Sequence, residues 1–188
     1  MKKLFHFACT FLLLISCCRE TEKGRYFLTG ESKNFFPQTE QTLTYTDANG
    51  KRYTSHYYEV QNRWEQINEG ADSCYYFSAE TNESAFSIED KVKGTVNIVS
   101  RPENAQYIYI NIPLANGHIA RYIPDEEVSP FYNHLKNVVV AGFQLNNVIV
   151  FTYDNPGVDT VIDKIYFSQS GIEMVLYKDG SWLKRTEE

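Results

Sequence analysis

The chain has 188 residues, with 18 basic and 24 acidic side chains and a formal net charge of −6. Its length suits one domain, and an aromatic content of 15% excludes a disordered chain, which would be poor in aromatic residues. The acidic balance argues against a non-specific nucleic-acid binder, since that role needs a basic surface, so we expect no nucleic-acid partner.

Residues 1–16 have the pattern of a secretory leader. Lys2 and Lys3 give it a positive start, and an apolar core runs from Leu4 to Ile15. A helix needs ~20 residues to cross a bilayer, and this core is shorter. We therefore expect a signal peptide rather than a membrane-spanning helix.

The end of this leader, Leu14-Ile15-Ser16-Cys17, resembles the processing motif of bacterial lipoproteins. The resemblance implies cleavage before Cys17, a diacylglyceryl group on its thiol and an acyl chain such as palmitate on its new amine. Because each buried CH₂ contributes ~0.8 kcal/mol, two or three chains would hold the protein on a membrane. The alternatives are an ordinary signal peptide with a chance cysteine and an uncleaved anchor.

The residues after Cys17 indicate which membrane holds this anchor. The next residue is Cys18 rather than Asp, so the inner-membrane retention signal of enteric bacteria is absent from the sequence. The charged run from Arg19 to Lys23 loosely resembles the surface-export signal of Bacteroidota lipoproteins, although a solvated tether explains it equally well. We expect an outer-membrane anchor, and the sequence leaves undecided which side of that membrane the protein faces.

The remaining cysteines give little further information about the fold. Cys9 leaves with the leader, so only Cys18 and Cys74 could pair. Cys18 would lie at the membrane end of a tether, so we expect no bridge and interpret Cys74 as a small, half-buried strand residue.

Residues 17–37 are expected to form a lipidated tether and residues 38–188 a single β domain, with Phe35-Phe36-Pro37 docking on the domain. Turn signals then separate short strands, and Asn-Gly is the strongest of them because both central residues of a type I′ turn need positive φ. The expected strands are 42–46, 51–60, 74–79, 95–100, 106–114, 118–123, 138–145, 148–153, 160–168, 172–178 and 181–185, with the main turns at Asn49-Gly50, Asn116-Gly117, Asn146-Asn147, Ser170-Gly171 and Asp179-Gly180.

Helical periodicity is scarce. Residues 87–93 could form one or two turns capped by Ser87, and residues 124–137 could begin a short helix that Pro130 limits. Regular short strands with tight turns predict an all-β fold, an antiparallel meander of about ten strands closed as a barrel or folded as a sandwich, with one or two short helices.

The second half resembles uncharacterised outer-membrane lipoproteins of Bacteroidota. The resemblance rests on the Gly-aromatic-x-x-Asn-Val hairpin in residues 140–148, on residues 164–168 and on the Leu-Tyr-Lys-Asp-Gly-Ser-Trp-Leu segment at 176–183. It implies a β-rich, membrane-anchored domain, and it carries over no active site because the family has none assigned.

Tyrosines alternate along two predicted strands. Tyr107 and Tyr109 share one face of a strand whose other face is Ile108, Ile110 and Ile112, and Tyr53 and Tyr57 alternate in the same way. Aligned rings can stack on the flat apolar face of a sugar, or they can pack between strands. We therefore take these four tyrosines as candidate binding residues, while Trp64 and Trp182 are interpreted as core or rim.

Other chemistry-bearing residues give weak signals. His56, His118 and His134 lack metal-ligand spacing, so we expect no metal and no cofactor. Asp125-Glu126-Glu127 is interpreted as the first turn of a short helix, with a calcium loop as the alternative. Asp159-Thr160-Val161 resembles the O-glycosylation motif of secreted Bacteroidota proteins and makes Thr160 a candidate site.

These observations predict a non-enzymatic binding or accessory module whose partner is a glycan or an envelope protein. The alternative is a small barrel that carries an apolar ligand or lipoprotein cargo, which would need an interior cavity of a few hundred Å³. A hydrolase with dispersed carboxylates is a third hypothesis, and it would need two carboxyl groups facing one cleft.

Overall fold

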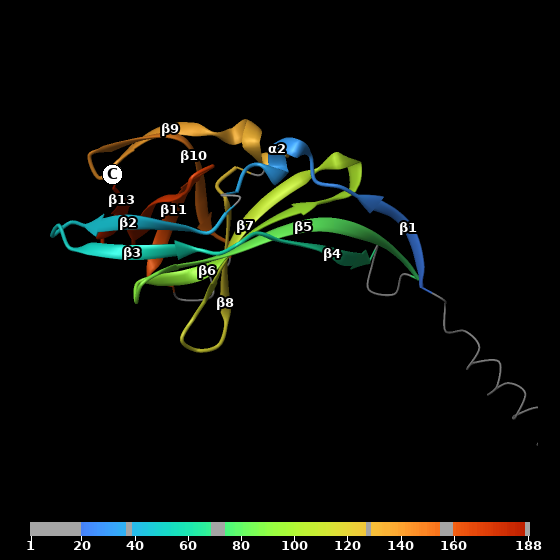
Figure 1. Ribbon diagram of the computed structural model, residues 1–188, viewed down its shortest axis with the longest axis horizontal. Coiled ribbons are helices and arrows are strands. Elements are labelled where there is room, and N and C mark those ends of the chain that lie inside the picture. The colour runs from blue at the N-terminus through green and yellow to red at the C-terminus, as the bar shows by residue number, and fades with distance from the viewer. Residues whose placement is uncertain (1–19, 37–38, 69–73, 127–128, 155–159, 187–188) are drawn as a thin grey trace, which may run out of the picture.

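Ten strands close into one antiparallel barrel (Figure 1). The computed structural model describes residues 20–36, 39–68, 74–126, 129–154 and 160–186. Around the barrel the strands follow the order β5 (Tyr75–Ile88), β3 (Arg52–Tyr57), β2 (Gln41–Asp47), β13 (Trp182–Arg185), β12 (Gly171–Tyr177), β11 (Ile162–Ser168), β10 (Phe143–Tyr153), β8 (Ile119–Pro124), β7 (Gln106–Pro113) and β6 (Val92–Ser100). β6 pairs with β5 and closes the ring, so the all-β prediction is confirmed, in its barrel form.

Large apolar side chains fill the barrel interior. Alternate residues of each strand point inward, as in β7, where Ile108, Ile110 and Ile112 are buried and the residues between them are half-buried. The largest fully buried side chains of the interior cluster are Tyr45, Tyr57, Tyr122, Phe35, Phe86, Phe131, Phe151 and Phe167. Burying each such side chain contributes roughly 1.5–3 kcal/mol, so the interior is the main source of stability.

Three further strands lie outside the ring. β9 (Lys136–Val140) pairs with β10, whereas β4 (Gln61–Asn68) and β1 (Thr21–Tyr26) pair with opposite edges of β5. β5 is 14 residues long, and its first half extends past the barrel with β4 and β1 beside it (Figure 1). We call this three-stranded extension, made of β1, β4 and residues 75–80 of β5, the flap.

The segment expected to be a tether is built into the fold. β1 pairs in parallel with β5, and a short helix, α2 (Gly30–Lys33), follows it. Phe35 and Phe36 are buried in the core, which confirms that they dock on the domain, while Pro37 lies outside the described residues. The folded unit therefore begins by Thr21 rather than at residue 38.

One predicted turn is wrong. The chain reverses between β9 and β10 at Ala141-Gly142, where both residues have positive φ, and not at Asn146-Asn147. Asn147 also has positive φ, but it sits in a bulge where the register shifts between Leu145 and Val148. An Asn pair suits a bulge as well as a turn, because Asn tolerates this backbone conformation.

The helical predictions also need correction. Residues 87–93 form the end of β5, a tight turn and the start of β6, because Phe86, Ile88 and Val92 all point into the core. In the second segment only a short 3₁₀ turn, η2 (Phe131–His134), forms, and β9 starts two residues after it. Another 3₁₀ turn, η1 (Pro102–Asn104), joins β6 to β7.

Candidate functional site

Tyr107 and Tyr109 lie on the outside of the barrel, as the strand alternation predicted. Tyr107 is opposite Val99 of β6, and Tyr109 is opposite Asn97. β6 pairs with β5, and β5 pairs with β4, so each of these two lines of opposite residues continues across the sheet. The outer surface therefore spans four neighbouring strands. Both tyrosines are half-buried, which leaves part of each ring available at this surface.

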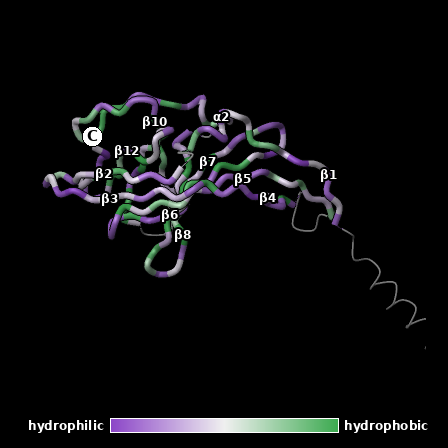
Figure 2. The backbone as a smooth tube through the Cα atoms, viewed as in Figure 1, coloured by the Kyte–Doolittle hydropathy of each residue, from purple (hydrophilic) through white to green (hydrophobic). Residues whose placement is uncertain are grey.

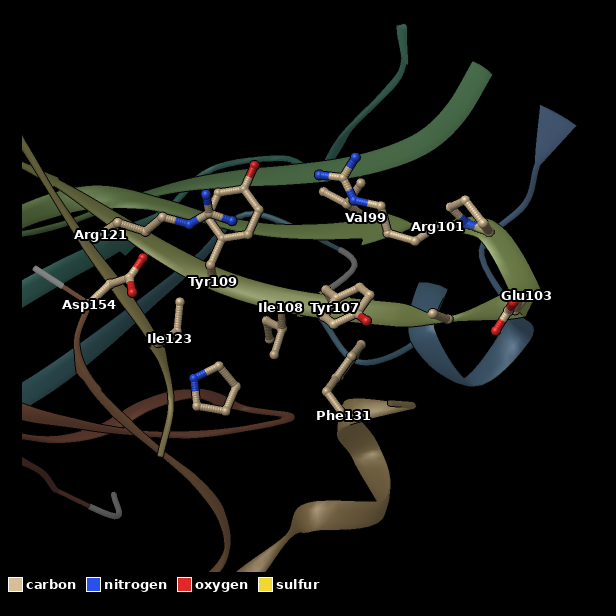
Figure 3. A pocket seen from close by; sticks show the side chains of 13 residues that line it. Val99, Arg101, Glu103, Tyr107, Ile108, Tyr109, Arg121, Ile123, Phe131 and Asp154 are labelled. Atoms are coloured by element: carbon tan, nitrogen blue, oxygen red, sulfur yellow. The ribbon is translucent and has the colours of Figure 1, made fainter. Parts of the chain in front are cut away.

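Two arginines frame these tyrosines. The guanidinium of Arg121, on β8, lies 4.1 Å from the centroid of the Tyr109 ring, and Arg101 follows the end of β6 (Figure 3). Neither arginine makes an ion pair with a carboxylate of the described residues. We call Tyr107, Tyr109, Arg101 and Arg121 the Tyr–Arg face.

A surface cavity of about 650 Å³ opens at this face. β8 pairs with β7 up to Tyr122 and with β10 from Tyr122 onwards. β7 and β8 therefore separate beyond Tyr122, and the cavity forms at this separation. All four residues of the Tyr–Arg face line it, together with Ile123 and Phe131. The cavity therefore combines flat aromatic surface, apolar surface and the two guanidiniums, with the carboxylates of Glu103 and Asp154 at its ends (Figure 3).

The electrostatics keep Tyr109 a hydrogen-bond donor. Burial and the negative charge of Glu65 raise its pKa, while the nearby guanidiniums, with Arg121 the strongest, lower it, and the net pKa is above the ordinary value. The phenol therefore stays protonated at neutral pH beside two fixed positive charges.

Two buried polar atoms lie under this surface without a hydrogen-bond partner among the described residues. They are Oδ1 of Asn97, on the strand next to Tyr109, and Oγ1 of Thr81, one strand further away. A buried polar group without a partner costs about 1–3 kcal/mol unless a water or ligand supplies the missing hydrogen bond. Ser55 and Tyr177 have buried hydroxyls of the same kind away from this face.

Tyr53 and Tyr57, the other two candidates, do not join this face. Their side chains are only 4% and 2% exposed and belong to the core. The Tyr57 hydroxyl accepts a hydrogen bond from the Ile172 amide at 2.7 Å, and the Tyr53 hydroxyl donates one to Asp47 at 2.9 Å. The prediction that they form a binding platform is wrong, because the inward side of β3 holds them.

Thr160 is also buried, at 4% exposure. Its Oγ1 lies 2.6 Å from the Tyr122 hydroxyl and accepts a hydrogen bond from the Ile162 amide at 3.3 Å. A glycan on this oxygen would displace Tyr122 from the core, so the folded protein does not present Thr160 for O-glycosylation. Asp159 of the motif lies outside the described residues.

The acidic cluster does not begin a helix. Asp125 and Glu126 instead form ion pairs with Lys136 at 3.1 and 2.8 Å, and Glu127 lies outside the described residues. Lys136 lowers the pKa of Glu126. In the described part of the chain no group of three or more His, Cys, Asp or Glu side chains could hold a metal ion.

Cys74 is disulfide-bonded, so its interpretation as an unpaired strand thiol is wrong, and it is no candidate nucleophile. The other cysteines of the sequence, at positions 9, 17 and 18, lie outside the described residues, as does the predicted lipidation site Cys17. No helix among the described residues has the length and apolar character needed to cross a membrane.

The sequence interpretation missed both arginines of the site. Counting back through the Asn116-Gly117 turn places Arg121 opposite Asn111, and therefore on the outer face with Tyr109, so the signal for Arg121 was present. Arg101 carries no such signal, because its position depends on η1, where Glu103 and Asn104 adopt positive φ.

The fold and the site together define an antiparallel barrel with an aromatic and basic cavity on its outer face. Comparison of the chain with known protein families, with characterised proteins and with solved structures finds no match. The residues of the site are therefore the basis for assigning a function.

Proposed function

We propose that the protein is a lipid-anchored, non-enzymatic binding module of the bacterial outer membrane, and that its Tyr–Arg face binds an acidic glycan. The observation that carries the glycan proposal is Arg121, which stacks on Tyr109 at the mouth of a cavity without a carboxylate partner among the described residues. The anchor is supported by the lipoprotein motif that ends at Cys17.

The chemistry of the cavity suits a sugar with negative groups. The apolar face of a pyranose ring can stack on a tyrosine ring, which offers apolar area at low conformational cost. A guanidinium can form two parallel hydrogen bonds to a carboxylate or phosphate, which a neutral sugar cannot match. Arg101 and Arg121 both line the cavity, so an acidic sugar would find two such groups.

A hydrolase fits the cavity less well. Its two carboxylates, Glu103 and Asp154, lie at opposite ends of the cavity (Figure 3). Hydrolysis of a glycosidic bond needs two carboxyl groups that face each other across the bond. Binding without catalysis is therefore the better supported function.

The carrier alternative would need space inside the barrel. Fully buried rings such as Tyr45, Phe86 and Phe167 occupy that interior. The cavity described above opens on the outer face, beside Arg101 and Arg121, and meets the interior at Ile108 and Phe131, which are buried core residues. An apolar cargo would have to displace core side chains, which favours the binding-module proposal.

Calorimetry with envelope oligosaccharides tests the glycan proposal. We expect an oligosaccharide bearing uronic acid or phosphate groups to bind, and Tyr109→Ala and Arg121→Ala each to weaken binding about tenfold or more, which is ~1.4 kcal/mol. Arg52→Ala is the matched control, because Arg52 is an exposed arginine on β3, away from the cavity. Equal binding by all three variants, or binding of neutral sugars alone, would refute the proposal.

Protease treatment of intact cells tests the location. Digestion of the domain on intact cells would place it on the outer surface, where glycans and host molecules are the accessible partners. Protection that is lost on lysis would place it in the periplasm and indicate a partner within the envelope.

A further inference from the structure

An exposed aromatic pair joins the flap to the chain that follows it: Trp64 lies on β4, and Phe27 directly follows β1. Phe27 is 60% exposed and Trp64 45% exposed, and their rings meet edge to face with centroids 5.2 Å apart. The Arg25 guanidinium lies 5.8 Å from the Trp64 ring. Two large apolar rings in this position remain in water although the barrel buries rings of the same kind.

Strand alternation fixes the side of the flap on which these rings lie. Trp64 is opposite Glu80, and Asn62, two residues earlier on β4, donates a hydrogen bond to the buried Glu80 side chain, so Trp64 shares the inward-facing side. Arg63 points to the other side, where it forms an ion pair with Glu83 at 3.1 Å. The aromatic pair therefore continues the inward face of the barrel beyond its rim.

Polar contacts hold Phe27 in this exposed position. The next residue, Leu28, is buried, and its amide donates a hydrogen bond to Glu80 at 2.8 Å. On the other side, the Phe27 carbonyl accepts a hydrogen bond from Gln106 at 3.4 Å. The backbone on both sides of the ring is thus fixed, and the ring cannot turn into the core without breaking these contacts.

The position of the flap in the sequence places it close to the proposed anchor. β1 begins at Thr21, four residues after Cys17. At ~3.5 Å per residue, Thr21 can lie no more than about 14 Å from the Cα of the lipidated cysteine, and Phe27 no more than about 35 Å. β1 pairs with residues 75–79 of β5, so the start of the flap lies beside the chain that leads to the proposed anchor.

We infer that the inward face of the flap, with Phe27, Trp64 and Arg25, rests on the bilayer that holds the acyl chains of Cys17. This inference rests on the proposed lipid anchor. Aromatic rings are enriched at the membrane–water interface, where their apolar bodies lie beside the lipid headgroups. Arg25 beside them is held in place by an ion pair with Glu22 at 3.1 Å. Because the anchor already holds the protein at the bilayer, binding of the flap to that bilayer is nearly intramolecular. A small apolar patch is therefore sufficient for this contact.

This orientation assigns opposite roles to the two sides of one sheet. Trp64 faces the bilayer, whereas Arg63 lies on the side that continues across β5 and β6 to Tyr107. The Tyr–Arg face would therefore point away from the membrane and towards soluble or surface-bound glycans.

Fluorescence of the full-length lipidated protein in vesicles of phosphatidylethanolamine and phosphatidylglycerol tests this orientation. The chain has two tryptophans, so Trp182→Phe leaves Trp64 as the single reporter. We expect its emission to shift to shorter wavelength, and lipids brominated on their acyl chains to quench about half of it or more, because interfacial rings lie roughly 5–10 Å into the headgroup–acyl boundary. Circular dichroism checks that each variant is folded.

The matched control moves the reporter to the other side of the same strand. In a chain with Trp64→Phe, Trp182→Phe and Glu65→Trp, the single tryptophan should escape quenching. Equal quenching at both positions, or none at Trp64 in protein that floats with vesicles and carries lipid by mass spectrometry, would overturn the inference while the anchor stands. Protein without lipid that fails to float would refute the anchor, and this orientation with it.

Discussion

Glu80 is the buried carboxylate on which the junction between flap and barrel depends. Its side chain is 5% exposed, and Lys33 of α2 lies 2.7 Å away as its ion-pair partner. Hydrogen bonds from the Leu28 amide and from Asn62 complete its shell, each at 2.8 Å. Burial raises the pKa of Glu80, but Lys33 and these two donors together outweigh burial and leave the pKa below its ordinary value.

We predict that Glu80→Gln destabilises the protein by about 1–3 kcal/mol at neutral pH, because it removes the charge that Lys33 and the two hydrogen-bond donors surround. A carboxyl with a lowered folded-state pKa contributes stability above its unfolded pKa and loses it as the pH falls through the folded value. The difference between wild type and variant should therefore shrink in acid.

Urea unfolding at pH 7 and near pH 4 measures both effects. Glu83→Gln is the control, because Glu83 pairs with Arg63 at the surface and should contribute less than about 1 kcal/mol. A variant as stable as wild type at pH 7 would contradict this account of Glu80.

At the scale of elements, the turn between β9 and β10 does not have the residues that would stabilise it most. Ala141 has φ of 48° and Gly142 φ of 82°, so both central positions adopt the left-handed region. Glycine enters that region without penalty, whereas alanine is strained there by roughly 1–2 kcal/mol. The pairing of Val140 with Phe143 nevertheless fixes the turn at these two residues.

We predict that Ala141→Asn raises the free energy of unfolding by about 0.5–1 kcal/mol, since it creates the Asn-Gly pair that type I′ turns prefer. Gly142→Ala should lower it by a similar amount or more, because a side chain at φ of 82° is strained. Urea midpoints of the two variants give the test, and a shift of both in the same direction would contradict it.

The elements that the sequence revealed are those with apolar alternation. β7 is one of them, and its outward tyrosines were found for this reason. β4 lacks the signal, since six of its eight residues are Gln, Asn, Arg or Glu, which makes the strand mainly hydrophilic (Figure 2), and its pairing runs along β5. β1 is similar, and its pairing with β5 depends on residues more than 50 positions away.

At the scale of the whole molecule, closure of the barrel comes from contacts that no local pattern contains. β2 and β13 pair across most of the chain, and β5 pairs with both β3 and β6. Buried hydroxyls also make contacts between residues far apart in the sequence. The Tyr45 hydroxyl donates a hydrogen bond at 2.6 Å to the carbonyl of Ile172, which is 127 residues away. Alternation correctly predicted which residues face inward for many strands, but it could not distinguish a core tyrosine such as Tyr57 from an outward-facing tyrosine such as Tyr109.

These buried tyrosines make the barrel sensitive to high pH. Burial raises the pKa of both Tyr57 and Tyr122 to about 12, against an ordinary value of 10.0. A raised folded-state pKa means that the stability contribution is complete below the unfolded pKa and is lost as the pH rises through the folded value. We therefore predict that the free energy of unfolding falls between pH 10 and pH 12, by on the order of 2 kcal/mol for each group.

Absorbance of the tyrosinate band, recorded together with circular dichroism, measures this coupling. Tyr57 and Tyr122 should ionise only as the barrel unfolds, so part of the rise in tyrosinate absorbance should coincide with the loss of the β-sheet spectrum. Tyr122→Phe should weaken the dependence of stability on pH, because it removes one buried phenol, although it also leaves Thr160 without that hydrogen bond. Ionisation of every tyrosine near pH 10 with the β-sheet spectrum intact would show that water reaches these hydroxyls, and that the interior is less tightly packed than the core contacts imply.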